Sequence, residues 1–276
     1  MILVAGGTGR LGTIVVSRLV AGGQAVRVLT REPGRARHLP EGAVEVVRGD
    51  VRDRAGIERA MSGVTTVVSL VQGFAGPGRV SPASVDRDGN ANLVDVAAAA
   101  GADVVMMSVV GASSDSPMDL FRAKYAAEQH LRASQARGTV VRATAFVELW
   151  AEIMAKAPVL GRGENPINFV SVHDVAAVVE RVVVDPGFRG RTVEVGGPRN
   201  VSFNELAALL HELGDGKGNV RHVPRGLLRI MAPLARQPRA ALAMDTLDMT
   251  FDGAAARADF ADLPMTDVRA ALVPAA

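Results

Sequence analysis

The sequence predicts an α/β fold, in which a doubly wound parallel sheet is covered by helices on both faces and followed by a small lid. Short apolar runs of strand length alternate with segments of helical character over the first half of the chain. A glycine-rich turn joins the first apolar run to the first helical segment. This regular alternation ends near residue 146, where the smaller part begins.

Each strand of the predicted sheet is a nearly continuous apolar run, which is typical of parallel strands buried on both faces. Right-handed crossovers place the C-terminal ends of such strands along one edge of the sheet, where ligands bind. The strands are expected at 2–5, 25–30, 43–47, 65–71, 104–109 and 139–143, and the helices between them at 13–20, 57–61, 90–100 and 121–134.

The pattern after residue 146 is less regular. Ser202 and Glu205 have the spacing of a capping box, which predicts a helix that begins there and continues to Leu213. Residues 215–276 contain five prolines and mixed helical patches. The other expected elements are a Pro/Gly loop at 158–166, a strand at 168–172, a helix at 173–184 and a strand at 192–195.

Composition excludes several kinds of protein. The 276 residues contain no cysteine, which rules out disulfides, thiol catalysis and Cys-ligated zinc, and the five histidines lack metal-ligand spacing, so no metal is expected. A net charge of +2 without a compact basic tract argues against a nucleic-acid partner. No apolar run reaches the roughly 18 residues that span a membrane. With the first strand starting at residue 2 and no leader before it, we expect a cytoplasmic protein.

The glycine-rich turn, Gly6-Gly7-Thr8-Gly9-Arg10-Leu11-Gly12, follows the first strand and opens the first helix. Glycines let a pyrophosphate approach the backbone, and a helix N-terminus offers N–H groups and a partial positive charge. The turn therefore predicts a dinucleotide site; the alternative is a turn that only packs the helix onto the sheet. The expected cofactor contacts in it are Gly6, Thr8, Gly9, Arg10, Leu11 and Gly12.

The residues after the second strand favour NADP(H) over NAD(H). Thr30 stands where an acidic residue would bind the ribose hydroxyls of NAD, and Arg31 and Arg35 can bind a 2′-phosphate. The alternative is that Arg31 is a solvated loop charge and Glu32 binds the ribose.

Further cofactor contacts are expected at the ends of the next two strands. Asp50 and Val51 follow the third strand and are expected near the adenine. Ser69 and Leu70 lie at the end of the fourth strand and are expected beside the pyrophosphate or ribose.

These residues resemble the short-chain dehydrogenase/reductase superfamily, and specifically its atypical NmrA-like branch. The resemblance implies an NAD(P)-binding Rossmann core and a small substrate region; relatives include quinone and flavin reductases, isoflavone-reductase-like enzymes and NADP-sensing regulators. The matching segments are 6–12, Arg-Gly-Asp-Val at 48–51, Ser108 to Ala112, Lys124 with Glu128, Asn168 to Ala176 and Val195 to Pro198.

We therefore expect a Rossmann core of residues 1–146 plus 166–198. Residues 147–165 plus 199–276 are expected to form a substrate-binding lid, with both parts in one compact unit. Phe146, Glu148, Leu149 and Trp150 follow the sixth strand and are expected to line the substrate mouth. Trp150 could stack on a flat ligand or anchor the lid.

The chain departs from the superfamily in its proton donor. The superfamily usually has Tyr-x-x-x-Lys on the helix after the fifth strand, but Leu120 stands four residues before Lys124. The only tyrosine, Tyr125, is one position past the lysine and points about 100° away around the helix. Tyr125 as the acid competes with a packing role.

Three other side chains are candidates for catalysis. Lys124 could bind the nicotinamide ribose or donate a proton, or it could be an exposed lysine paired with Glu128. Ser108 could bond a carbonyl or the carboxamide, or only cap its strand. His173 is a weaker candidate for proton donor, beside Asp174 at a helix start.

These observations predict an NADPH-dependent reductase that passes hydride to a small conjugated acceptor such as a quinone, flavin or enone. The alternative is a non-catalytic regulator that senses NADP(H). A carbonyl reductase or epimerase with an unusual acid is a third hypothesis. The expected partner is a small-molecule substrate, and the chain could be a monomer or a homodimer.

Overall fold

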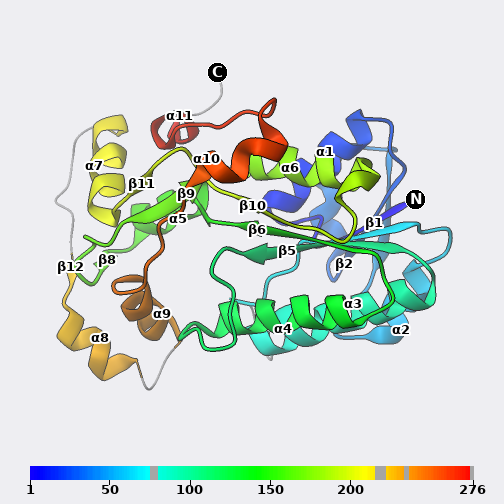
Figure 1. Cartoon of the computed structure of the whole chain (residues 1–276), viewed down its shortest axis with the longest axis horizontal. Coiled ribbons are helices and arrows are strands. Elements are labelled where there is room, and N and C mark those ends of the chain that lie inside the picture. Colours follow the sequence, from blue (N-terminus) through cyan, green and yellow to red (C-terminus); the bar gives the residue numbers. More distant parts are fainter. Residues whose placement is uncertain (75–79, 215–221, 233–235, 274–276) are drawn as a thin grey trace. The chain divides into compact units, whose positions relative to one another are not determined.

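The computed structural model describes residues 1–74, 80–214, 222–232 and 236–273 (Figure 1). The chain divides into two units. Residues 1–142 with 175–194 form the first, and residues 143–174 with 195–276 form the second. Every helix among the described residues is too short or too polar to cross a membrane.

The described part of the first unit is built on a seven-stranded sheet with the order β10-β6-β5-β4-β1-β2-β3. The pairs from β3 through β2, β1 and β4 to β5 are all parallel. Strand order reverses between β1 and β4, which makes this the switch point of a doubly wound sheet. The strands are β1 (Ile2–Ala5), β2 (Val26–Thr30), β3 (Val44–Arg48), β4 (Thr66–Ser69), β5 (Asp103–Val109), β6 (Gly138–Ala143) and β10 (Thr192–Val195).

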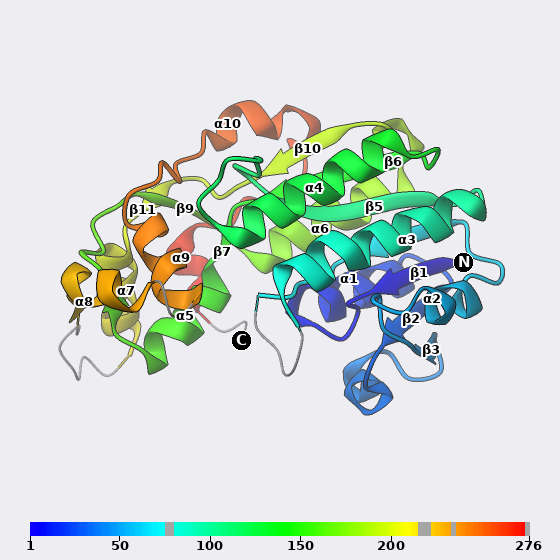
Figure 2. The same ribbon diagram turned by 90° about the horizontal axis from the view of Figure 1, so that it is seen from below.

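Helices cover both faces of this sheet, so the predicted fold class is confirmed (Figure 1). One face carries α1 (Arg10–Ala21) and α6 (Val172–Val184), which an ion pair of 2.7 Å between Arg18 Nε and Glu180 Oε2 connects. Figure 2 shows two helices of the other face, α3 and α4, side by side. That face carries α2 (Arg54–Ala60), α3 (Asp88–Ala99) and α4 (Asp119–Ala133), with a π-helical turn, η2 (Pro82–Arg87), before α3.

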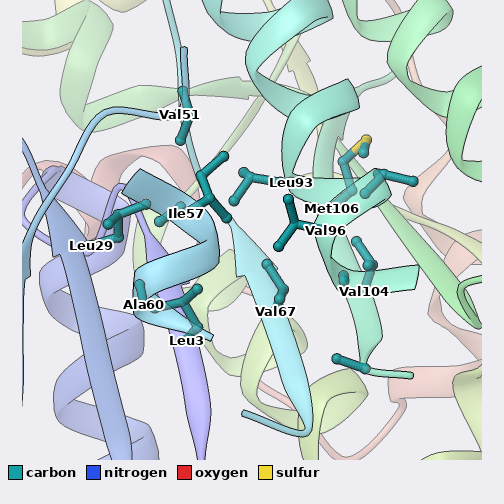
Figure 3. Packing of buried hydrophobic residues seen from close by; sticks show 14 of the residues in the cluster. Leu3, Leu29, Val51, Ile57, Ala60, Val67, Leu93, Val96, Val104 and Met106 are labelled. Atoms are coloured by element: carbon teal, nitrogen blue, oxygen red, sulfur yellow. The ribbon is translucent and has the colours of Figure 1, made fainter. Parts of the chain in front are cut away.

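A hydrophobic core lies between the sheet and α2, α3 and α4 (Figure 3). Leu3, Ile57, Leu93 and Met106 in this core are completely shielded from solvent. Burial of a large aliphatic side chain contributes about 1.5–3 kcal/mol. This core packs against strands of the sheet at whose ends the candidate site lies.

The second unit contains two small sheets and several helices in its described part. A three-stranded sheet has the order β11-β9-β7, and a two-stranded sheet pairs β12 with β8. The strands are β7 (Ala145–Phe146), β8 (Val159–Leu160), β9 (Ile167–Val170), β11 (Asn200–Val201) and β12 (His222–Val223), and the helices are α5 (Val147–Lys156), α7 (Phe203–Leu213), α8 (Arg225–Met231), α9 (Arg236–Met244), α10 (Gly253–Ala256) and α11 (Val268–Leu272).

The boundaries differ from the expected ones in several places. Residues 143–146, 166–174 and 195–198, which were expected in the Rossmann core, fall in the second unit, where β9 pairs with β7 and β11. The strand expected at 65–71 ends at Ser69, and part of the loop expected at 158–166 forms β8. The patches expected after residue 214 are partly confirmed as α8 to α11, whereas residues 215–221, 233–235 and 274–276 lie outside the described residues.

The predicted capping box at the start of α7 is confirmed. Ser202 Oγ accepts a hydrogen bond of 3.2 Å from Glu205 N, and Glu205 Oε2 accepts one of 2.6 Å from Ser202 N. The bond from the Ser202 amide is the main reason why the pKa of Glu205 lies below its ordinary value of 4.5. Trp150, the only tryptophan, reports on this helix, because its ring centroid lies 4.8 Å from that of Phe203 in α7.

Replacing Ser202 by alanine should lower the free energy of unfolding by about 1 kcal/mol, because the Glu205 amide loses its acceptor. The measurement is the urea midpoint followed by Trp150 fluorescence. Ser17→Ala, at an exposed position of α1, is the control that should leave this midpoint in place. An equal midpoint for Ser202→Ala and the parent chain would contradict the assigned cap.

The carboxylate of the same cap should make stability depend on pH. A lowered pKa in the fold means that the Glu205 contribution is present above the unfolded value near 4.5 and is lost as the pH falls through the lower folded value. The stability difference between the parent chain and Glu205→Gln should therefore be largest at neutral pH and shrink below about pH 4. Urea titrations at several pH values measure it, and a pH-independent difference would refute this assignment.

Candidate functional site

The glycine turn at residues 6–12, called the cradle below, lies at the switch point of the sheet. It follows β1, which pairs with β2 on one side and with β4 on the other. Gly6 has φ of +85°, a conformation that residues with a side chain rarely adopt. The cradle therefore occupies the position where doubly wound folds bind nucleotides.

Two glycines of the cradle are required by close backbone contacts. A Cβ atom on Gly6 would lie 2.8 Å from the carbonyl carbon and oxygen of Leu70. One on Gly12 would lie 2.1 Å from the oxygen of Gly6, so Gly12 lets α1 approach the turn. Packing alone is enough to require glycine at these two positions. This agrees with the alternative interpretation, in which the turn only packs the helix onto the sheet.

The start of α1 fits a phosphate. The residue before the helix is Gly9, which has no side chain to cap it, and its amide donates a 3.0 Å bond to Gly6 O. The amides of the first turn, among them those of Leu11 and Gly12, have no preceding helical turn to bond. With the helix dipole, these amides are groups that could hold a pyrophosphate. Arg10 is exposed at this end of the helix.

Thr30 at the end of β2 contacts Thr8 of the cradle. Thr30 is buried; its Oγ1 accepts a 3.3 Å bond from Glu32 N and lies 3.4 Å from Thr8 Oγ1. Arg31 and Arg35 follow on the surface, both exposed. Thr30 thus fixes the turn that presents the two arginines.

The two residues expected near the adenine have different surroundings. Arg52 bonds both carboxylate oxygens of Asp50, and this hydrogen bonding is the main cause of a lowered Asp50 pKa, to which the charge of Arg31 also contributes. Val51 instead packs into the hydrophobic core, and its carbonyl accepts a bond from Asn92 Nδ2. The Val51 side chain is therefore a core residue, and its expected contact with adenine stays a prediction.

The end of β4 forms one wall of the cradle. The Leu70 backbone continues past the strand, donates from its amide to Ala5 O at 2.9 Å and lies against Gly6. Ser69 is buried and donates to Asn90 Oδ1 at 2.5 Å. The Leu70 backbone thus lies beside the cradle, and the Ser69 hydroxyl is used by an internal bond; the contact of both residues with the coenzyme stays a prediction.

Lys124 is not the exposed partner of Glu128 that the helix spacing allows. Its side chain is 5% exposed, and Nζ lies 3.0 Å from Asp86 Oδ1 and 3.0 Å from Val71 O. Asp86 is fully buried in η2. Asp86 does not stand out in the sequence, since no periodic pattern marks the π-helical turn that carries it.

Glu128 binds a different set of partners. It is completely buried, accepts a 2.5 Å bond from Ser108 Oγ and forms ion pairs with Arg142 at 2.7 Å and Arg132 at 3.0 Å. Its hydrogen bond is the main cause of a raised Arg142 pKa. Because a hydroxyl has one proton, Ser108 retains only lone pairs for a ligand and can accept from a carboxamide N–H.

Tyr125 follows Lys124 on α4 and is half-buried. Its position one residue past the buried lysine keeps the two side chains on different sides of the helix. The arrangement of tyrosine and lysine that the superfamily uses is therefore missing from α4.

The expected substrate residues belong to the second unit. Glu148 accepts bonds from Ser171 Oγ at 2.7 Å and from Val172 N at 3.0 Å, so its carboxylate caps α6. Trp150 packs on Phe203 and thereby attaches α5 to α7, although it remains half-buried. Phe146 and Leu149 are also half-buried, and their contact with substrate stays a prediction.

His173 is exposed in the first turn of α6. Its neighbour Asp174 is buried, and the two carboxylate oxygens accept bonds from Thr266 N at 2.6 Å and Thr266 Oγ1 at 2.8 Å. Asp174 thus lies in the first turn of α6 and also connects this helix start to Thr266 near the end of the chain. The role of His173 as proton donor stays a prediction.

Comparison with known proteins agrees with the geometry of the cradle. A model of an NAD(P)H-binding family matches residues 6–186. The NAD(P)H azoreductase of Xenophilus azovorans is 29% identical over 216 residues, which are 76% of this chain and 72% of that protein. The (4-alkanoyl-5-oxo-2,5-dihydrofuran-3-yl)methyl phosphate reductase of Streptomyces griseus is 33% identical over 217 residues, with the same coverage of 76% and 72%.

A solved structure shows the same fold. The NADPH-dependent quinone oxidoreductase of Escherichia coli, determined in complex with NADPH, superimposes with a TM-score of 0.77 at 21% identity, over 98% of this chain and 97% of that one. From the cradle, the family match and the 33% identical relative, the chain belongs to the NAD(P)H-binding family, within the atypical short-chain dehydrogenase/reductase superfamily that its motifs resemble.

Proposed function

We propose that this protein is an NADPH-dependent reductase that passes hydride to a small conjugated acceptor without a tyrosine acid. The observation that carries the proposal is the uncapped helix start in the cradle, at the switch point of the sheet. Bound NADPH supplies the hydride, and the first-turn amides of α1 hold its pyrophosphate.

The preference for NADP(H) rests on the loop after β2. Arg31 and Arg35 are exposed there, next to a threonine where an NAD-binding chain has an acid. A guanidinium binds phosphate oxygens through two parallel, charge-assisted bonds. The buried Thr30 hydroxyl holds the backbone of this loop at Glu32 N.

The acceptor class is inferred from the missing acid. A conjugated acceptor delocalises the electron pair that arrives with the hydride, so water can deliver the balancing proton and positioning supplies much of the rate. Ser108 can accept a hydrogen bond from a carboxamide N–H, because its own hydroxyl proton is donated in the hydrogen bond to Glu128. The relatives support this class, since azo compounds, quinones and dihydrofuranones are all conjugated.

A non-catalytic sensor of NADP(H) is the second candidate. It is favoured by the internal bonds of Lys124 and Ser108, which leave both side chains poorly placed to donate a proton to a substrate. Such a protein would bind the coenzyme as tightly as a reductase and turn nothing over.

Arg31→Ala should weaken NADPH binding by about 10- to 100-fold, because a hydrogen bond to a charged group is worth about 1.5–3 kcal/mol. NADH binding should change little. Calorimetric titration with both coenzymes measures this. Arg59→Ala, which removes an exposed arginine of α2, is the charge-matched control. Equal losses for the two coenzymes would refute the phosphate assignment.

NADPH oxidation should be rapid with quinones or azo dyes and slow with simple ketones. The measurement is the loss of nicotinamide absorbance at saturating NADPH. Tyr125→Phe should keep the rate, whereas loss of a true general acid costs about 10²- to 10⁴-fold. Coenzyme binding with no turnover across the panel would favour the sensor, and a collapse in Tyr125→Phe would restore tyrosine as the acid.

A further inference from the structure

The chain segment directly after β4, residues 70–73, is held by buried charges. Lys124 Nζ donates to Val71 O at 3.0 Å, and Asp86 Oδ2 accepts from Gly73 N at 2.7 Å. The two side chains also contact each other, with 3.0 Å between Nζ and Asp86 Oδ1. The two members of this ion pair thus bond the segment at Val71 and at Gly73, two residues apart.

The same segment supports the cradle from the other side. The carbonyl group of Leu70 and the amide of Val71 lie 2.8 Å and 3.1 Å from the position of a Cβ on Gly6. The backbone of the segment therefore lies against the turn so closely that only a glycine fits at residue 6, and a shift of the segment would change the surface on which the turn packs. The position of Gly6 depends on where Lys124 and Asp86 hold the segment.

Asn90 strengthens the connection between η2 and the end of β4. Its Nδ2 donates to the Asp86 carbonyl at 2.7 Å, and its Oδ1 accepts the Ser69 bond. Three residues at and after the end of β4 are thus bonded to buried polar side chains. Ser69 bonds Asn90, Val71 bonds Lys124 and Gly73 bonds Asp86. Gly73 itself is tightly packed, since a Cβ there would lie 2.4 Å from Ser81 O.

We propose that the Lys124–Asp86 ion pair is a positioning device for the coenzyme, which sets the cradle through residues 70–73. Asp86 is then a positioning residue, and Lys124 acts through the backbone of Val71 and not as a proton donor. Lys124 Nζ donates one hydrogen bond, to Val71 O, and forms an ion pair with Asp86, while its side chain is 5% exposed. The inference rests on the proposed binding of NADPH.

Buried ion pairs seldom add net stability compared with apolar residues of similar volume. Leucine or methionine at these positions would fill the space but bond neither Val71 O nor Gly73 N. The charges of Lys124 and Asp86 therefore serve to place residues 70–73 and not to raise the stability of the fold.

The test compares Lys124→Met and Asp86→Asn with the parent chain in NADPH affinity, kcat, pH profile and thermal midpoint. Each variant should raise the NADPH Kd by about tenfold or more, because phosphate bonds to a displaced turn are lost. At saturating NADPH, kcat with a quinone should change less than the Kd, and the pH profile should keep its shape. Lys124→Arg keeps the positive charge and should recover part of the affinity.

Leu93→Val is the matched control, because it loosens the core beside η2 without touching the ion pair. The NADPH affinity of Asp86→Asn is compared with that of a control variant that has the same thermal midpoint. If Asp86→Asn loses no more affinity than this control, the proposal is overturned. A loss of kcat in Lys124→Met with unchanged Kd and an altered pH profile would overturn it too, in favour of an acid role. Asp86→Asn is nearly isosteric and keeps the test valid if Lys124→Met does not fold. A parent chain that binds no nicotinamide coenzyme would instead refute the proposed function itself.

Discussion

The close contact between the Gly6 turn and the backbone that continues β4 is the constraint on which the site depends. With 2.8 Å from the Leu70 carbonyl to the position of a Cβ, the contact allows no side chain at residue 6. It fixes the turn at the point where strand order reverses. The start of α1 follows this turn, and residues 70–73, which the Lys124–Asp86 ion pair holds, form the wall against which the turn lies.

The sheet and the cradle could be predicted because they follow local rules. Apolar runs of four to seven residues mark the strands, although the edge strand β3 is largely exposed, and the glycine spacing marks the turn. The capping box at Ser202 is equally local, and it was predicted correctly. Boundaries were less certain: Val71 looks like a strand residue, but its carbonyl bonds Lys124 and the strand has already ended.

The polar interior of the site could not be predicted, because it depends on tertiary contacts. Helix spacing alone suggests Lys124 with Glu128, four residues apart. In the fold, Lys124 instead bonds Asp86, 38 residues earlier, and Glu128 bonds Ser108 and Arg142. A helix pattern gives the face on which a charge lies but not which distant element approaches that face. Glu148 is a similar case. Its carboxylate caps α6 by accepting bonds from Ser171 and Val172, which are more than 20 residues later in the sequence.

The exposed arginines after β2 have an evolutionary consequence. Arg31 and Arg35 lie on the surface, whereas Gly6 and Gly12 of the cradle are in backbone contacts that leave no room for a Cβ atom. Substitutions in the arginine loop therefore leave the core packing intact, while most substitutions in the cradle would disturb it. On the proposed role of these arginines, coenzyme choice can drift between lineages, or be redesigned in the laboratory, without a new scaffold.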